Sequence, residues 1–239
     1  PDSDPRACFD VGHYVRVARI AERGKLDAIF LADTPAITDR IDYRSFMSME
    51  PTIVLATVAA ATTHIGLIAT ASTTYNEPYN IARRFATLDL ASGGRAGWNA
   101  VTTADAAASR NFGLANVLEH KARYDRAKEF AEVVHALWDS WEDDAFVGDK
   151  ATARFVDTSK VHPIAHRGAH YSVAGPLNVP RSPQGRPVTV QAGGSSDGRD
   201  LAAAQAEAVF TLAQTIDEGA AYARDLRTRA AAYGRSGDS

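Results

Sequence analysis

Residues 191–198, QAGGSSDG, combine types that could bind a phosphate. They follow a short apolar run and precede a predicted helix, so their backbone N–H groups can face an anion while Ser195 adds a hydroxyl. The spacing matches neither a Walker A loop nor a complete G-x-G-x-x-G fingerprint. A phosphate cradle and a simple tight turn are both open interpretations of this segment.

His120 and Tyr124 stand four residues apart at the start of the longest predicted helix, so both project from one helix face. An imidazole and a phenol at a helix N-terminus suit an anionic or hydroxylated ligand, with ordinary packing roles as the alternative. Two side chains do not make a metal site, and the single cysteine, Cys8, excludes paired thiolate ligands. No G-x-S-x-G elbow is present. We therefore expect no metal site and assign no catalytic residue.

Further polar residues stand at or near the ends of short apolar runs. Asp33 directly follows the run 27–32, a cluster of hydroxyls begins at Thr70, and Asn99 lies in a run that follows a glycine turn. Parallel strands of β/α proteins carry ligand-facing groups at their carboxyl ends. The alternatives are a helix cap for Asp33 and an ordinary side-chain-bonded turn for the hydroxyls. This set of groups favours holding a cofactor over covalent attack on a substrate.

Helical and strand patterns alternate along the chain that must position these residues. The patterns predict strands at 27–32, 64–70, 95–101, 187–191 and 208–212, and helices at 10–23, 51–62, 118–141, 197–206 and 216–233. Ile81, Phe85 and Leu88 mark one more helix, which ends before Gly93. Strands separated by helices imply a parallel sheet with right-handed crossovers. An open doubly wound sheet and a TIM (β/α)₈ barrel both fit, the barrel being incomplete with about five of its eight strands. Residues 143–186 are expected to form an ordered insertion within a single unit, 1–239.

The bulk composition limits the possible partners and compartments. The chain has 26 basic and 29 acidic residues, a net charge of −3, which gives no electrostatic reason to expect nucleic acid or an anionic membrane. No apolar run reaches the roughly 18 residues of a membrane helix, and no signal peptide opens the chain. A single cysteine excludes an internal disulfide. We expect a cytoplasmic protein.

Residues 92–99, SGGRAGWN, resemble a signature of bacterial-luciferase-like flavin monooxygenases. The sequence is most similar to the branch that contains nitrilotriacetate monooxygenase, dibenzothiophene-sulfone monooxygenase and pristinamycin synthase. The resemblance extends over essentially the whole chain, through segments 9–14, 21–28, 72–75, 175–185 and 191–195.

The resemblance implies a TIM barrel that binds reduced FMN, delivered by a separate NAD(P)H-dependent flavin reductase, and uses O₂ to oxygenate a small organic substrate. It also implies a homo-oligomer. Tyr124 and Ser195 would hold the FMN phosphate and Asp33 would lie nearer the ring or the ribityl chain, while Ser72 would replace Thr70 if the strand register shifts. The FMN contacts carried over by motif are Asp33, Thr70, His120, Tyr124 and Ser195, with Asn99 and Ser196 as additions.

The chain departs from the family in length, because family members are nearly twice as long. The family's first strand would precede Pro1, and the chain stops before the seventh strand. We therefore expect a fragment, or a protein that a partner completes, with poor activity in isolation. The alternatives are an F420-dependent oxidoreductase and a truncated non-catalytic paralogue that acts as a binding or assembly subunit. The flavin hypothesis requires Asp33, His120 and Ser195 to surround one hollow.

Overall fold

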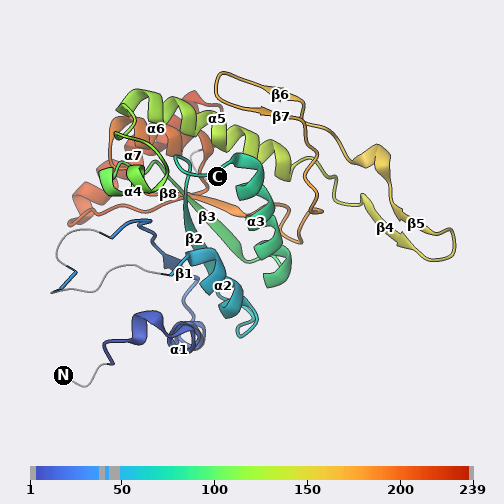
Figure 1. Ribbon diagram of the computed structural model, residues 1–239, viewed down its shortest axis with the longest axis horizontal. Coiled ribbons are helices and arrows are strands. Elements are labelled where there is room, and N and C mark those ends of the chain that lie inside the picture. The colour runs from blue at the N-terminus through green and yellow to red at the C-terminus, as the bar shows by residue number, and fades with distance from the viewer. Residues whose placement is uncertain (1–3, 38–40, 43–48, 237–239) are drawn as a thin grey trace.

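Five parallel strands form the central sheet of the computed structural model, which describes residues 4–37, 41–42 and 49–236 (Figure 1). The strand order is β1-β2-β3-β8-β9, so each crossover passes to the neighbouring strand of the sheet. The strands are β1 (Ala28–Leu31), β2 (Gly66–Ser72), β3 (Ala96–Val101), β8 (Val188–Gln191) and β9 (Ala208–Val209). The parallel sheet expected from the alternating pattern is confirmed.

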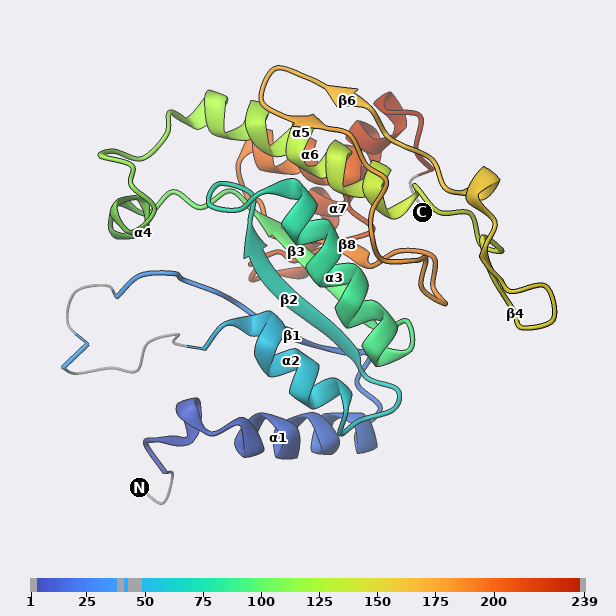
Figure 2. The same cartoon turned by 45° about the vertical axis from the view of Figure 1, so that its right-hand side comes forward.

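Helices pack against one face of this sheet and follow its strands along the chain (Figure 2). Their starts follow the capping rules: the Asp10 carboxylate accepts the Gly12 N–H at 2.8 Å, and Pro51 occupies the first turn of its helix. The helices are α1 (Val11–Arg23), α2 (Pro51–Ala59), α3 (Pro78–Ser92), α5 (His120–Trp138), α6 (Ser196–Gln205) and α7 (Ile216–Ala232), with 3₁₀ turns at Ala7–Phe9 and Thr158–Lys160.

The predicted bounds differ from the observed ones by up to three residues, most at the second predicted helix, the longest helix and the last predicted strand. The second predicted helix ends at Ala59 instead of 62, and the last predicted strand keeps only the two residues that pair with β8. The sequence patterns also gave no sign of α4 (Ala106–Asn111), a six-residue helix. This helix depends on a local cap, the Asp105 carboxylate accepting the Ala108 N–H at 2.7 Å, and it is too short to show a periodic apolar face.

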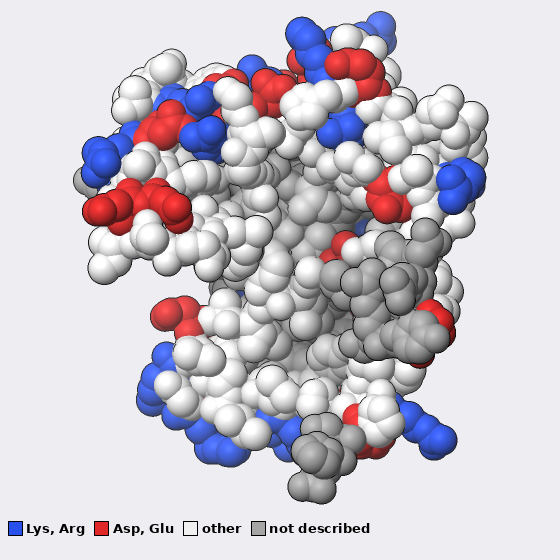
Figure 3. Space-filling model, turned by 90° about the vertical axis from the view of Figure 1, so that its left-hand side faces the viewer, with Lys and Arg blue, Asp and Glu red and all other residues white. Residues whose placement is uncertain are grey.

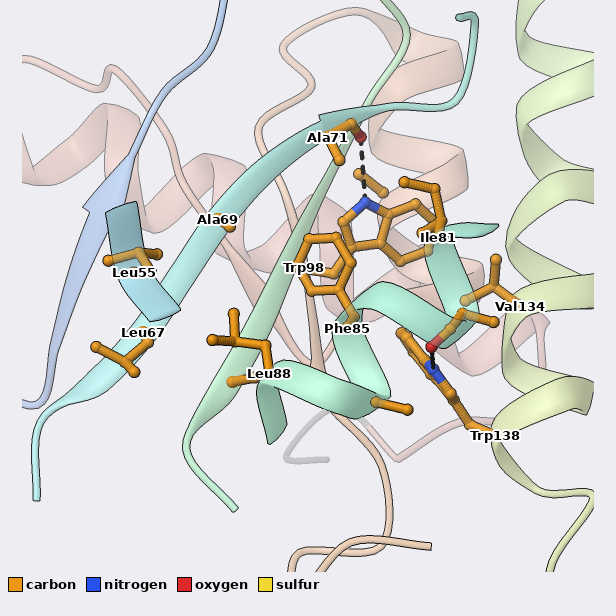
Figure 4. Close-up of a cluster of buried hydrophobic side chains, with 14 of the residues drawn as sticks. Leu55, Leu67, Ala69, Ala71, Ile81, Phe85, Leu88, Trp98, Val134 and Trp138 are labelled. Atoms are coloured by element: carbon orange, nitrogen blue, oxygen red, sulfur yellow. Dashed lines mark hydrogen bonds between the residues drawn. The ribbon is translucent and has the colours of Figure 1, made fainter. Parts of the chain in front are cut away.

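The hydrophobic core lies between the sheet and α3 and α5, with Trp98 at its centre (Figure 4). Trp98 is fully buried, packs against Phe85, Phe130 and Trp138, and donates its indole N–H to the Ala71 carbonyl at 3.1 Å. Because strand side chains alternate between faces, the next residue along β3 points to the other side of the sheet. In the Trp-Asn pair of the signature, Trp98 therefore packs in the core and Asn99 points to the opposite face of the sheet.

The opposite, concave face is formed by the alternate strand residues. Thr70 of β2 and Asn99 of β3 stand at the same register position on this face. The sheet curls so strongly that Phe30 of β1 and Phe210, just after β9, stack with ring centroids 5.9 Å apart, although they come from its two edges. The described strands therefore form a curled parallel half-barrel, as expected of an incomplete barrel.

The segment between α5 and β8 forms two antiparallel hairpins, β4 (Phe146–Asp149) with β5 (Arg154–Val156) and β6 (His166–Arg167) with β7 (Ser172–Val173). The first hairpin projects away from the sheet (Figure 1). Glu129 of α5 ties down the second by accepting from His166 Nε2 at 3.0 Å and from the Tyr171 N–H at 2.9 Å. Across residues 4–37, 41–42 and 49–236, no helix is both long and apolar enough to cross a membrane.

Candidate cofactor-binding site

The starts of α5 and α6 meet at one corner of the rim formed by the carboxyl ends of the strands. Ser195 is the N-cap of α6: its hydroxyl oxygen accepts the Gly198 N–H at 3.1 Å and donates to the Tyr124 hydroxyl at 3.3 Å. A helix N-terminus carries a partial positive charge and free N–H groups. The corner therefore combines two helix starts with hydroxyl donors, as an anion requires.

Glycine is required at two positions here because the backbone at Gly193, in the loop before α6, lies very close to the backbone at Gly198, in the first turn of α6. A Cβ at Gly193 would lie 2.7 Å from Gly198 Cα, and a Cβ at Gly198 would lie 3.1 Å from the Tyr124 hydroxyl. Tyr222 of α7 supports this loop from behind by donating its hydroxyl to the Gly193 carbonyl at 2.8 Å. Sequence reasoning missed Tyr222, because nothing in its own segment marks it as a contact of the loop.

His120 is the first residue of α5, and its ring contacts both Tyr124 of the same helix and Asp197 of α6. Its ring centroid is 4.8 Å from that of Tyr124, and its Nδ1 is 3.0 Å from Asp197 Oδ2 in the first turn of α6. The side chains of His120 and Asp197 are 49% and 51% exposed, so both are accessible to a ligand. The sequence analysis did not identify Asp197 as a site residue.

Ser196 faces in a different direction from Ser195. Its hydroxyl and its carbonyl both accept from the Arg229 guanidinium of α7, each at 3.4 Å. Arg229 is held in turn by the Asp225 carboxylate at 3.1 Å. Ser196 therefore lies at the start of α6, as predicted, but its hydroxyl contacts α7.

Thr70 and Asn99 form a buried polar pair on the concave face. Asn99 Nδ2 donates to Thr70 Oγ1 at 2.9 Å, and the two residues are 2% and 3% exposed, respectively. Asn99 Oδ1 is buried with no hydrogen-bond partner among the described residues. A buried acceptor without a partner is costly, so it fits a donor that a bound ligand supplies. Ser72 instead accepts from Thr103 Oγ1 at 2.8 Å, which leaves Thr70 as the partner of Asn99.

Asp33 lies at the end of β1, apart from the corner. Burial raises the pKa of its carboxyl group, and the negative charge of Glu50 raises it further while Arg84 opposes the shift. Glu50 caps α2 and its carboxylate is 4.0 Å from the Arg84 guanidinium. Asp33 therefore belongs to a charged group formed with α2 and α3.

The structure gathers His120, Tyr124 and Ser195, while Asp33 follows β1 on the same carboxyl-end rim, so the hollow shared with Asp33 stays a prediction. β1 and β8 are three strand spacings apart along the sheet, but the curl brings Phe30 of β1 and Phe210 after β9 to a ring-centroid distance of 5.9 Å across it. A cavity of about 290 Å³ between α5 and α6 is lined by Tyr124 and Asp197, while His120, Ser195 and Asp33 are not among its lining residues. Seen from the side where α4 and the start of α5 lie, the molecule is hollowed in the middle, with most charged side chains around the margin (Figure 3).

A curled parallel sheet covered by helices, with polar groups collected at the carboxyl ends of its strands, is the arrangement of (β/α)₈-barrel enzymes. The fold therefore places the chain in the barrel class, with the corner as its candidate ligand site. The family model for luciferase-like monooxygenases matches residues 2–239. The chain belongs to this family, as its signature residues predicted.

Two relatives represent the predicted branch of the family. The chain is 49% identical to nitrilotriacetate monooxygenase component A of Aminobacter aminovorans, over 100% of this chain and 55% of that protein. It is 48% identical to dibenzothiophene-sulfone monooxygenase of Rhodococcus erythropolis, over 95% of this chain and 52% of that protein. The chain spans about half the length of these relatives.

Solved structures agree with the fold. A long-chain alkane monooxygenase superposes with a TM-score of 0.94 at 38% identity, over 100% of this chain and 57% of the other. A riboflavin lyase, solved with modified FMN and riboflavin, superposes with a TM-score of 0.93 at 38% identity, over 100% of this chain and 55% of the other. The barrel-type fold predicted from the resemblance is confirmed.

Proposed function

We propose that this protein is the oxygenating component of a two-component monooxygenase, which uses reduced FMN and O₂ to oxygenate a small organic substrate. The reduced flavin would come from a separate NAD(P)H-dependent reductase. Membership of the luciferase-like monooxygenase family supports the reaction class, and the riboflavin lyase solved with modified FMN supports the cofactor. Because the chain spans about half the length of its relatives, the activity, the substrate class and the reductase partner are all part of this proposal.

The residues of the corner fit the phosphate of FMN. Ser195, Tyr124 and His120 bring two hydroxyls and an imidazole to the starts of two helices. Asn99 Oδ1, buried and without a partner among the described residues, fits a flavin or ribityl donor on the concave face.

Bound reduced FMN would supply the reaction with O₂, so the protein's task is to bind and orient the flavin and to exclude water. The Ser195 and Tyr124 hydroxyls would hold the phosphate end, and the Thr70–Asn99 pair would fix the flavin against β2 and β3. Ser196 would support the start of α6 through Arg229 without touching the phosphate. The observation that carries the proposal is the meeting of His120, Tyr124 and Ser195 at the carboxyl end of β8.

The proposal is tested first by binding. The purified protein should bind FMN more tightly than riboflavin, measured by anaerobic titration of both the oxidised and the photoreduced flavins. Tyr124→Phe should reduce this preference because it removes a phosphate donor. The matched control is Tyr233→Phe, since Tyr233 lines the same cavity but donates its hydroxyl to Asp200 at 2.6 Å. Equal affinity of the wild type for FMN and riboflavin would contradict the phosphate corner.

The reaction is tested by oxygen transfer. With FMN, NAD(P)H and a flavin reductase, the protein should transfer ¹⁸O from ¹⁸O₂ into a sulfone, an aminopolycarboxylate or an alkane substrate, detected by mass spectrometry. The reductase and FMN without the protein form the control. Tighter binding of F420 than of FMN would favour the deazaflavin alternative. Flavin binding without any labelled product would favour a non-catalytic binding subunit.

A further inference from the structure

The ion pair between His120 and Asp197 carries an inference that deepens the proposed function and depends on it. We infer that Asp197 is a positioning residue, whose carboxylate holds His120 as an imidazolium that donates its Nε2–H to the FMN phosphate. Asp197 Oδ2 lies 3.0 Å from His120 Nδ1, within hydrogen-bond distance. Asp197 therefore acts on the ligand only through the histidine ring.

The ring of His120 is restrained from two sides. Asp197 holds Nδ1, and the Tyr124 ring lies against the imidazole with a centroid distance of 4.8 Å and an interplanar angle of 43°. Tyr124 is itself held by the Ser195 hydroxyl at 3.3 Å. These contacts fix the orientation of the imidazole with respect to the start of α6, which is the element proposed to receive the phosphate.

The carboxylate of Asp197 determines which hydrogen bonds the His120 ring can make to a phosphate. A neutral ring carries one N–H, and a ring whose Nδ1–H points at Asp197 has only a lone pair at Nε2. A lone pair faces a phosphate oxygen unfavourably, so the ring can bind both anions only with both nitrogens protonated. The inference therefore assigns one N–H of the ring to each anion, Nδ1–H to Asp197 and Nε2–H to the phosphate.

The other charged groups around His120 are engaged elsewhere. Glu119 uses its carboxylate to cap α5, accepting the Ala122 N–H at 2.9 Å. Lys121 pairs with Asp125 at 2.7 Å on the exposed side of the helix. Among the described ion pairs of this corner, Asp197 supplies the carboxylate that contacts the imidazole.

This inference predicts a result opposite to that of simple repulsion. A carboxylate beside an anion site weakens anion binding through its field, so its removal should strengthen FMN binding if the field were its only effect. If Asp197 acts through His120, removing its charge leaves the ring able to donate from one nitrogen at a time, and FMN binding weakens. The sign of the change therefore separates the two explanations.

The experiment compares FMN and riboflavin affinity in the wild type and in Asp197→Asn, which keeps the shape of the side chain. We expect the variant to bind FMN about tenfold more weakly, because a hydrogen bond to a charged group is lost, and riboflavin unchanged. Asp197→Glu should retain most of the FMN affinity. The matched control, Asp125→Asn, removes another carboxylate lining the same cavity and should change FMN affinity by less than about twofold.

A double-mutant cycle completes the test. In a His120→Gln background, Asp197→Asn should not weaken FMN binding further, since the carboxylate then has no imidazole to hold. FMN binding by Asp197→Asn that equals or exceeds the wild type would overturn the inference while leaving the proposed function intact. A wild type that does not prefer FMN over riboflavin would overturn both. Far-UV circular dichroism of each variant, matching the wild type, establishes that the comparison concerns folded protein.

Discussion

Arg95 binds several chain segments together at the amino ends of the strands, and its replacement by lysine should destabilise the protein strongly. Its Nε donates to the Ser92 carbonyl at 2.7 Å, Nη1 to the Ile65 carbonyl at 2.8 Å, and Nη2 to the Ala59 carbonyl at 3.0 Å. Thr62 accepts twice more, through its hydroxyl and its carbonyl, each at 3.1 Å. The single guanidinium thus joins the end of α2, the start of β2 and the end of α3.

Lysine cannot reproduce this set, because one ammonium donates at most three hydrogen bonds and lacks the planar fork of arginine. We expect at least two of the five bonds to be lost at about 1–1.5 kcal/mol each, or about 3 kcal/mol in the free energy of unfolding. The assay is urea denaturation followed by tryptophan fluorescence, which reports on the buried Trp98. The midpoint should fall without a change in the slope of the transition.

The control is Arg19→Lys, since Arg19 makes one hydrogen bond to a carbonyl in the same region, Ala61, at 3.0 Å. This variant should lose less than about 1 kcal/mol. FMN affinity of the folded Arg95→Lys protein should match the wild type, because Arg95 lies at the amino ends of the strands and the corner lies at their carboxyl ends. Equal destabilisation by both substitutions would refute the argument that stability depends on the number of hydrogen bonds. A loss of FMN binding in the folded Arg95→Lys protein would refute the separation between the amino ends and the carboxyl ends of the strands.

Three further substitutions test the site and the core. Gly198→Ala places a Cβ 2.9 Å from Gly193 Cα and 3.1 Å from the Tyr124 hydroxyl. The overpacking should cost about 1–3 kcal/mol, which exceeds the gain in helix propensity of roughly 1 kcal/mol. The variant should therefore be less stable, and FMN titration should show weaker binding. Burial lowers the pKa of His135 to about 4, so this residue is neutral when folded and the unfolded chain binds the extra proton between pH 6.5 and 4. Stability should therefore fall as pH falls through this window, by about 3 kcal/mol in total, and denaturation of His135→Gln should show a flatter profile; an unchanged profile would contradict the burial effect. Asn99→Leu removes the unpartnered acceptor, so the free energy of unfolding should change by about 1 kcal/mol or less while FMN affinity falls; unaltered affinity would exclude Asn99 from the site.

The sequence by itself determined the strands of the central sheet, the longer helices and the parallel type of the sheet. Apolar periodicity marked the helices, short apolar runs marked the strands, and their alternation required parallel pairing. The loop 191–198 was predicted to open a helix, and in the structure α6 begins at Ser196 with Ser195 as its N-cap. These features depend on neighbours within a few residues, so local patterns are sufficient to find them.

Only the tertiary structure decided which side chains meet. The contact of His120 with Asp197, of Asn99 with Thr70, and the support of the loop by Tyr222 each join residues from different elements. The resemblance put Asp33 nearer the flavin ring than the phosphate, and strand order puts it after β1, three strand spacings along the sheet from β8. The physical reason is that these contacts depend on strand order, register and the curl of the sheet, which arise from packing of the whole core and leave no periodic trace in any one segment.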